Sequence, residues 1–211
     1  MKRAIVLIAS ATVAAVLSSC CSSDNSSARI DALEKRVEAL EQAQKAMPSK
    51  PAKPEWVRIQ QVKARARMKE DAKNYSSDDL RIIETLYQVA NSKWETEEAK
   101  ESLKTLVSKY AKANRTGCAI LYLGQMSKGQ EQMDYLKKAI SDFSDCYYGD
   151  GVQVGAYARY YLANAYLAAG DNDSADKLFN EIRAQYPDAV THDGEKLLVV
   201  IDRDNAAKQA K

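Results

Sequence analysis

The strongest constraint on the fold is a set of apolar and small residues spaced as in two packed helices. Leucine, alanine and tyrosine occur at helical spacing before a Gly-Asp-Asn-Asp turn at 170–173, and alanine, phenylalanine and isoleucine follow it. This periodicity predicts a helical hairpin, because it places the apolar side chains of both helices on one shared face. The residues that carry the pattern are Leu162, Ala163, Tyr166, Ala175, Phe179, Ile182 and Pro187.

The pattern recurs twice toward the N-terminus. The nearer copy lies 39 positions earlier without a gap, so that Leu136 aligns with Ala175, Ile140 with Phe179 and Phe143 with Ile182. A poorer copy lies a further 37 positions back, where Tyr87 occupies the first small-residue position. The other aligned residues are Leu123, Gly124 and Tyr147 in the nearer copy, and Leu86, Ala99, Leu103, Leu106 and Tyr110 in the farther one.

These copies predict three helix pairs, at about 79–115, 116–152 and 155–190. Stacked helix pairs need roughly three units and a terminal cap, and the apolar start of 196–210 makes that segment the expected capping helix. We therefore expect an all-α chain with a repeat domain over 76–208, built as an α-solenoid. The spacing exceeds the usual ~34 residues, and the excess would lie between units, as at 148–151.

The pattern resembles the tetratricopeptide-repeat signature, whose first helix presents a large, a small and an aromatic residue and whose second presents alanine and then an aromatic. The resemblance implies tetratricopeptide-like helix pairs that bind an extended peptide or a partner helix on the concave side, lined by the first helices. The family's concave positions fall on Arg81, Gln88, Gln125, Tyr157, Tyr160 and Asn164, and also on Glu84, Asn91, Leu121, Lys128 and Leu167.

Among these positions, Asn164 is the best candidate to bind a peptide backbone, because an amide both donates and accepts hydrogen bonds. Tyr157 and Tyr160 offer aromatic contacts with a polar end. The alternative for each of these residues is an ordinary solvated helix surface.

The N-terminus has the three-part organisation of an export signal. Lys2 and Arg3 precede an apolar run over 4–17, which ends in small residues before Cys20. The run is shorter than the roughly 20 residues of a membrane-spanning helix, so we expect it to be removed.

The sequence Leu17-Ser18-Ser19-Cys20 resembles the lipobox of bacterial lipoproteins. The resemblance implies that 1–19 is a signal peptide, that Cys20 becomes acylated, and that 20–27 tethers the protein to a membrane. Several acyl chains anchor stably. Because no aspartate follows Cys20, an outer-membrane location facing the periplasm is expected. The alternative is an ordinary secretory signal with an accidental cysteine.

Residues 28–47 carry a heptad seam, with Ile30 and Val37 at a positions and Leu33 and Leu40 at d positions. The seam predicts a short coiled coil, and its core residues alone favour a parallel dimer.

The charged residues beside the seam favour a trimer over a dimer. Residues 29–34 and 36–41 resemble a motif of trimeric coiled coils, in which an arginine pairs with a glutamate of the neighbouring helix. In this chain the paired residues would be Arg29 with Glu34 and Arg36 with Glu41. A trimer is our first choice. The alternative is a single solvated helix, since barely two and a half heptads are marginal.

Two segments connect the coiled coil to the repeats. Pro48, Pro51 and Pro54 make 48–55 an extended spacer, because proline cannot continue a helix. The following segment, 56–75, predicts a basic helix with a weak apolar stripe of Trp56, Ile59 and Val62. We expect it to pack against the first repeat as a solvated helix, although such a helix could also contact anionic lipid or a partner.

Composition argues against several classes of function. The chain has 31 basic and 29 acidic residues, and removal of the signal leaves 29 of each, so nothing favours nucleic-acid binding. The single histidine, His192, supplies neither a metal site nor an acid-base pair. We expect neither an enzyme nor a cofactor.

Cys118 and Cys146 fall near the open ends of the two middle helices. An oxidising compartment permits a disulfide between them, but their spacing does not decide between a disulfide and two buried free thiols.

The leading functional hypothesis is a lipid-anchored scaffold that binds another envelope protein. The combination resembles periplasmic coordinators of peptidoglycan synthesis and outer-membrane constriction and, more distantly, the lipoprotein subunit of outer-membrane barrel assembly. The first family is normally not lipidated, and the second normally has five repeats and no coiled coil. The alternatives are a passive structural tether and an accessory subunit of an envelope enzyme.

Overall fold

A computed structural model describes residues 24–46 and 53–209, and within them all regular secondary structure is helical. The chain divides into two compact units, 1–52 and 53–211. The described part of the first unit, 24–46, forms the helix α1 (Asp24–Ala46). The predicted signal peptide, Cys20 and most of the proline spacer lie outside the described residues. None of the described helices has the length and apolar composition needed to cross a membrane.

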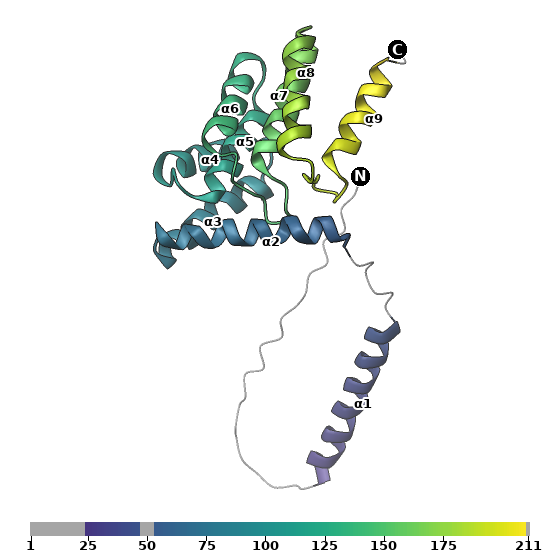
Figure 1. Ribbon diagram of the computed structural model, residues 1–211. Helices are drawn as coiled ribbons and strands as arrows, with labels where there is room; N and C mark the ends of the chain where they lie inside the picture. The colour runs from purple at the N-terminus through teal and green to yellow at the C-terminus, as the bar shows by residue number, and fades with distance from the viewer. Residues whose placement is uncertain (1–23, 47–52, 210–211) are drawn as a thin grey trace. The chain divides into compact units, whose positions relative to one another are not determined.

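The second unit is a succession of antiparallel helices (Figure 1). It begins with α2 (Glu55–Glu70) and a 3-10 turn, η1 (Asp71–Lys73). Three helix pairs follow in the described part of this unit, at the positions the sequence predicts, and then α9, the expected final helix. The bounds are α3 (Ser77–Ser92) and α4 (Glu97–Lys109), α5 (Asn114–Met126) and α6 (Gly129–Asp142), α7 (Val154–Ala168) and α8 (Asn172–Gln185), and α9 (Leu197–Gln209).

The last two pairs pack through small residues at positions that the pattern predicts. Ala163 and Ala175 are fully buried, and a Cβ on Gly124 would lie 3.0 Å from the Leu136 side chain. The helices therefore approach as closely as these small residues allow. Every buried side chain among the described residues lies between Val57 and Ile201, so the second unit contains its own core. We expect it to fold without 1–52.

The middle pair corrects the predicted alignment. Phe143 ends α6 and Tyr186 ends α8, each with its backbone N–H bonded to a carbonyl four residues earlier, whereas Ile182 lies inside α8. Phe143 therefore corresponds to Tyr186, not to Ile182. The second helices are shifted by about one turn from the gap-free alignment, because a two-residue turn joins α5 to α6 and α7 is longer than α5.

The loops that join successive pairs account for the long spacing of the repeats. We call 110–113, 143–153 and 186–196 the interunit loops. The last two have the same construction: an isolated antiparallel bridge, between Tyr147 and Gln153 in one and between Val190 and Lys196 in the other. Each also has a glycine with positive φ, Gly151 or Gly194, at its tight turn.

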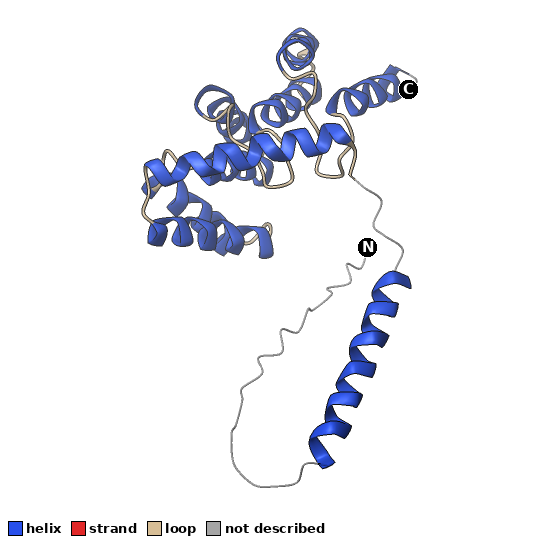
Figure 2. Cartoon of the chain, turned by 60° about the horizontal axis from the view of Figure 1, so that its bottom comes forward, coloured by secondary structure: helices blue, strands red, loops and turns tan. Residues whose placement is uncertain are grey.

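Helix α2 crosses all three interunit loops at one end of the helix pairs (Figures 1 and 2). Arg67 donates to the carbonyl of Lys112 at 3.4 Å in the first loop. Gln61 donates to the carbonyl of Asp150 at 3.2 Å in the second, and Gln60 to the carbonyl of Asp188 at 2.9 Å in the third. Polar side chains of one helix thus satisfy carbonyls of loops far apart in the sequence.

This arrangement corrects two expectations about α2. The helix contacts all three interunit loops, not only the first repeat. It also packs through Val57, Gln60 and Ala64, whereas Ile59 and Val62 of the predicted stripe are 47% and 57% exposed.

A buried carboxylate connects α2 to the middle pair. The N-terminus of α5 has no side-chain cap of its own, and both carboxylate oxygens of Asp71 accept from the backbone N–H of Asn114, at 3.0 and 2.9 Å. Arg67 holds Asp71 at 2.8 Å and also pairs with Asp145 of the second interunit loop at 2.7 Å. The Asn114 side chain in turn bonds both backbone groups of Tyr147.

Replacing Arg67 by alanine is expected to lower the free energy of unfolding by about 2 kcal/mol, because it leaves the buried Asp71 carboxylate without its cation. Arg58→Ala is the matched control on the same helix. Its pair with Glu55 is exposed on both sides, so the loss is expected to stay below about 0.5 kcal/mol. Urea unfolding of the two variants measures the difference, and equal losses would contradict the role assigned to Arg67.

Candidate functional site

The predicted ligand-binding residues lie on the first helices of the three pairs, α3, α5 and α7, which contact one another in sequence order. Arg81 and Gln88 are exposed on α3, and Gln125 is half-buried on α5. On α7, Tyr160 and Asn164 are half-buried, whereas only 7% of Tyr157 is exposed. We call the surface formed by these three helices the first-helix face.

A continuous row of aromatic rings connects the three first helices with the second and third interunit loops, and three of its members, Tyr87, Tyr148 and Tyr157, are buried. Tyr87 of α3 stacks on Tyr122 of α5, with ring centroids 5.7 Å apart, and Tyr122 contacts Tyr148 of the second interunit loop at 5.3 Å. His192 of the third interunit loop lies edge-on between Tyr148 at 5.0 Å and Tyr157 at 5.3 Å. Three further rings extend it: Trp94 beside Tyr122, and Tyr160 and Tyr161 beside Tyr157. We call these eight rings the aromatic row.

His192 connects two interunit loops as well as two rings of the aromatic row. Its Nδ1 lies 2.7 Å from Oδ2 of Asp150, so the pair joins the second and third interunit loops. Burial would raise the pKa of Asp150, but the hydrogen bond and charge of His192 outweigh burial and lower that pKa below its usual value. In the part of the chain that the structure describes, no group of three or more His, Cys, Asp or Glu residues could hold a metal ion.

The Gln88 side chain takes part in an ion-pair cluster at the α3 end of the first-helix face. Arg115 of α5 binds both carboxylate oxygens of Glu84, at 2.8 and 3.1 Å, and its guanidinium lies 4.0 Å from the Tyr87 ring centroid. The Gln88 amide donates to the same carboxylate at 2.6 Å. Burial raises the pKa of Glu84, but the hydrogen bonds from Arg115 and Gln88 lower it by more. This carboxylate is therefore ionised and fixes α3 against α5.

Tyr160 and Asn164 are connected to the end of the repeat domain. The Tyr160 hydroxyl donates to Asp204 of α9 at 2.7 Å, and the Asn164 amide donates to the backbone carbonyl of Tyr160 at 2.9 Å. Burial and the bond to Asp204 raise the pKa of Tyr160 to about 12. The Tyr160 hydroxyl is therefore already bonded to α9.

The two middle cysteines are buried free thiols in this structure, which is one of the two alternatives that the sequence leaves open. Both are buried; Cys118 donates to the carbonyl of Tyr147 at 3.3 Å, and Cys146 lies 3.6 Å from Arg67. Burial raises the pKa of Cys146 to about 12, although Arg67 lowers it. A protonated, enclosed thiol is unreactive and packs as a small apolar side chain. The Cys146 side chain also leaves no space for a side chain at position 117, because a Cβ on Gly117 would lie 2.7 Å from the Cys146 sulfur.

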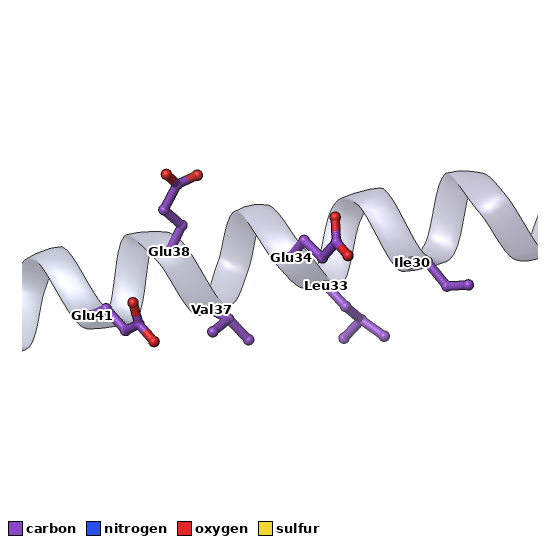
Figure 3. Close-up of a pocket in the computed structure, with 6 residues that line it drawn as sticks. All are labelled: Ile30, Leu33, Glu34, Val37, Glu38 and Glu41. Carbon is purple, nitrogen blue, oxygen red and sulfur yellow. The ribbon is translucent and has the colours of Figure 1, made fainter.

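Helix α1 carries the predicted oligomerisation residues. Ile30, Leu33 and Val37 project from one side of the helix, whereas Glu38 projects from another (Figure 3). These three and Leu40 are between 54% and 67% exposed, so no other described residue of 24–46 covers the seam. The charged candidates, Arg29, Glu34, Arg36 and Glu41, are exposed as well.

Sequence reasoning missed six of the eight rings in the aromatic row, since only Tyr157 and Tyr160 were predicted as site residues and Tyr87 was assigned only to helix packing. Tyr122, Tyr148, Tyr161 and Trp94 were not predicted as site residues, and His192 was given no role. The available signal was the repeated placement of tyrosine on the first helices. The ring contacts with the interunit loops had no such signal, because they join residues 26 to 44 positions apart.

Comparison with known families supports the repeat interpretation for one unit. A family model described as tetratricopeptide repeat matches residues 157–189, which cover most of α7, all of α8 and the start of the following loop. No curated protein and no solved structure matches the chain. The chain therefore contains a tetratricopeptide repeat, a module that generally mediates interactions between proteins.

Proposed function

We propose that this chain is a lipid-anchored scaffold of the bacterial cell envelope whose first-helix face binds a partner protein. The observation that carries the proposal is the tetratricopeptide repeat at 157–189, whose first helix presents Asn164 and Tyr160 at the surface. The preceding helix pairs would extend that repeat into a longer binding surface. We further propose an outer-membrane location facing the periplasm, with a role in envelope assembly or in its coordination with cell-wall synthesis.

The chemistry of the first-helix face suits an extended peptide. The rings of the row that reach the surface supply contact area at little cost in conformational entropy, because each has few rotatable bonds and is held by its neighbours. These rings are Trp94, Tyr122, Tyr160 and Tyr161, whereas Tyr87, Tyr148 and Tyr157 are buried. The side chains of Gln125 and Asn164 are amides, which can both donate to and accept from peptide groups, although the Asn164 amide already donates to the Tyr160 carbonyl. Tyr157 is the weakest of the predicted ligand contacts, because its ring is nearly enclosed.

A photoactivatable residue at Asn164 or Gln125 is expected to crosslink one discrete partner protein in the intact envelope. The variant Gln125→Ala/Asn164→Ala should weaken capture of that partner about tenfold or more, because two side-chain hydrogen bonds are lost. Quantitative crosslinking and binding of the purified partner measure both effects.

Asn180 and Gln185, exposed on α8, provide the matched control. The variant Asn180→Ala/Gln185→Ala removes the same side-chain types and should bind as tightly as the parent chain. Equal adducts from α7 and α8, or no protein adduct at all, would contradict binding at the first-helix face. The second result would favour the passive tether.

The anchor proposal rests on the resemblance of residues 17–20 to a lipobox, which lies outside the described residues. Cys20→Ser should abolish incorporation of a labelled fatty acid and leave the signal uncleaved, since the thiol is the proposed acceptor. Cys21→Ser, one position away, should retain both. Labelling of the native chain in its host and mass spectrometry decide the matter; equal labelling of the two variants would exclude Cys20 as the acceptor.

For α1 we propose a parallel trimeric coiled coil. The apolar seam is bordered by Arg29 and Arg36 on one side and by Glu34 and Glu41 on the other. In a parallel assembly, each arginine would face the glutamate of the next chain five positions further on. This charge pattern and the exposed seam support self-association.

Residues 22–211 are expected to sediment as a trimer, and residues 53–211 as a monomer. Leu33→Glu should raise the trimer dissociation constant at least about 100-fold, because each chain would bring a carboxylate into the apolar seam. Lys35→Glu introduces the same residue away from the seam and should leave the trimer intact. A monomeric 22–211 at every concentration would refute the coiled coil, and a dimer would refute the trimer.

A further inference from the structure

Helix α2 has two different faces, and only one is used by the repeat domain. The inner face buries Val57, Gln60 and Ala64 and holds the interunit loops. The opposite side points away from the helix pairs, which lie on one side of α2 only (Figures 1 and 2). Packing within the repeat domain therefore does not account for the residues on the outward side of α2.

The outward side has an apolar centre. At 3.6 residues per turn, Ile59, Val62 and Ala66 fall on one stripe along the helix. Ile59 and Val62 are 47% and 57% exposed, and nothing among the residues described in 53–209 covers them. One exposed apolar residue is ordinary, but these residues are adjacent and lie directly opposite the packed face.

Cations border this apolar stripe on both sides. Lys63 lies on one side, and Arg58, Arg65 and Lys69 lie on the other. Lys63, Arg65 and Lys69 form no ion pair with any other described residue. The acidic residues Glu55 and Glu70 stand at the two ends of the helix, where they pair with Arg58 and Lys73. We call this combination of stripe and cations the outer stripe.

We propose that the outer stripe binds an anionic lipid surface. The aliphatic side chains would enter the boundary between headgroups and acyl chains, and the flanking ammonium and guanidinium groups would bind lipid phosphates. A lipid surface fits better than an acidic protein because the cations flank an apolar strip on an open helix surface.

Lipid contact by α2 would orient the repeat domain. Since α2 crosses one end of the helix pairs, the pairs would stand on the membrane with their first-helix face directed sideways and open to a partner. The contact does not require Cys20. If Cys20 is acylated, the tether would raise the local concentration of α2 at the surface, so that a weak intrinsic affinity would be sufficient.

The test uses residues 53–211, which contain the whole described core and lack Cys20 and α1. This fragment is expected to co-sediment with phosphatidylglycerol-containing vesicles and not with pure phosphatidylcholine vesicles. Lys63→Gln/Arg65→Gln should weaken binding about 30-fold, since each cation near an anionic surface contributes roughly a fivefold effect. Ile59→Ser/Val62→Ser should weaken binding about tenfold, through loss of apolar burial.

The matched control is Lys109→Gln/Lys177→Gln, which removes two exposed cations from α4 and α8 and should bind like the parent fragment. Circular dichroism would show that all three double variants stay folded. The proposal is overturned if the fragment ignores phosphatidylglycerol, if the control pair weakens binding as much as the α2 pair, or if the serine variant binds unchanged. A photoactivatable residue at Val62 that crosslinks protein rather than lipid would also overturn it.

Discussion

A carboxylate on the short turn after α2 caps the first helix of the middle pair, and the arrangement of the repeat domain depends on that contact. Asp71 accepts from the backbone N–H of Asn114, while Arg67 holds Asp71 and reaches Asp145. The helix terminus gains a capping group and a negative charge where its dipole favours one. Because Asn114 also bonds Tyr147, the same contact fixes the next interunit loop.

The role of α2 explains why these repeats are longer than typical tetratricopeptide units. The additional residues form two similar interunit loops, each closed by an isolated bridge and a glycine with positive φ. They present carbonyls to Gln60 and Gln61 on one side and carry Tyr148 and His192 into the aromatic row on the other. The loops whose carbonyls hydrogen-bond to α2 are thus the same loops that contribute Tyr148 and His192 to the aromatic row.

The helix pairs could be predicted because local spacing of leucine, alanine and aromatic residues determines them. The register of α6 could not, since nothing near Ser127 indicates that its turn is shorter than the one after α7. The packed face of α2 was missed because Gln60 and Arg67 act through carbonyls and carboxylates remote in sequence, which hydrophobic periodicity does not detect. His192 was dismissed for lack of local partners, and its partners lie in another loop. The coiled coil and the lipid anchor remain predictions from sequence.

Hydrogen exchange of the native chain tests most directly whether α2 is an integral part of the repeat domain. If it fastens the interunit loops, the amides of residues 59–70 should exchange as slowly as those of α5 and α7, because all would open only when the domain unfolds. Exchange in α2 that is orders of magnitude faster, with α5 and α7 still protected, would contradict the account. It would show a helix that detaches while the helix pairs remain folded.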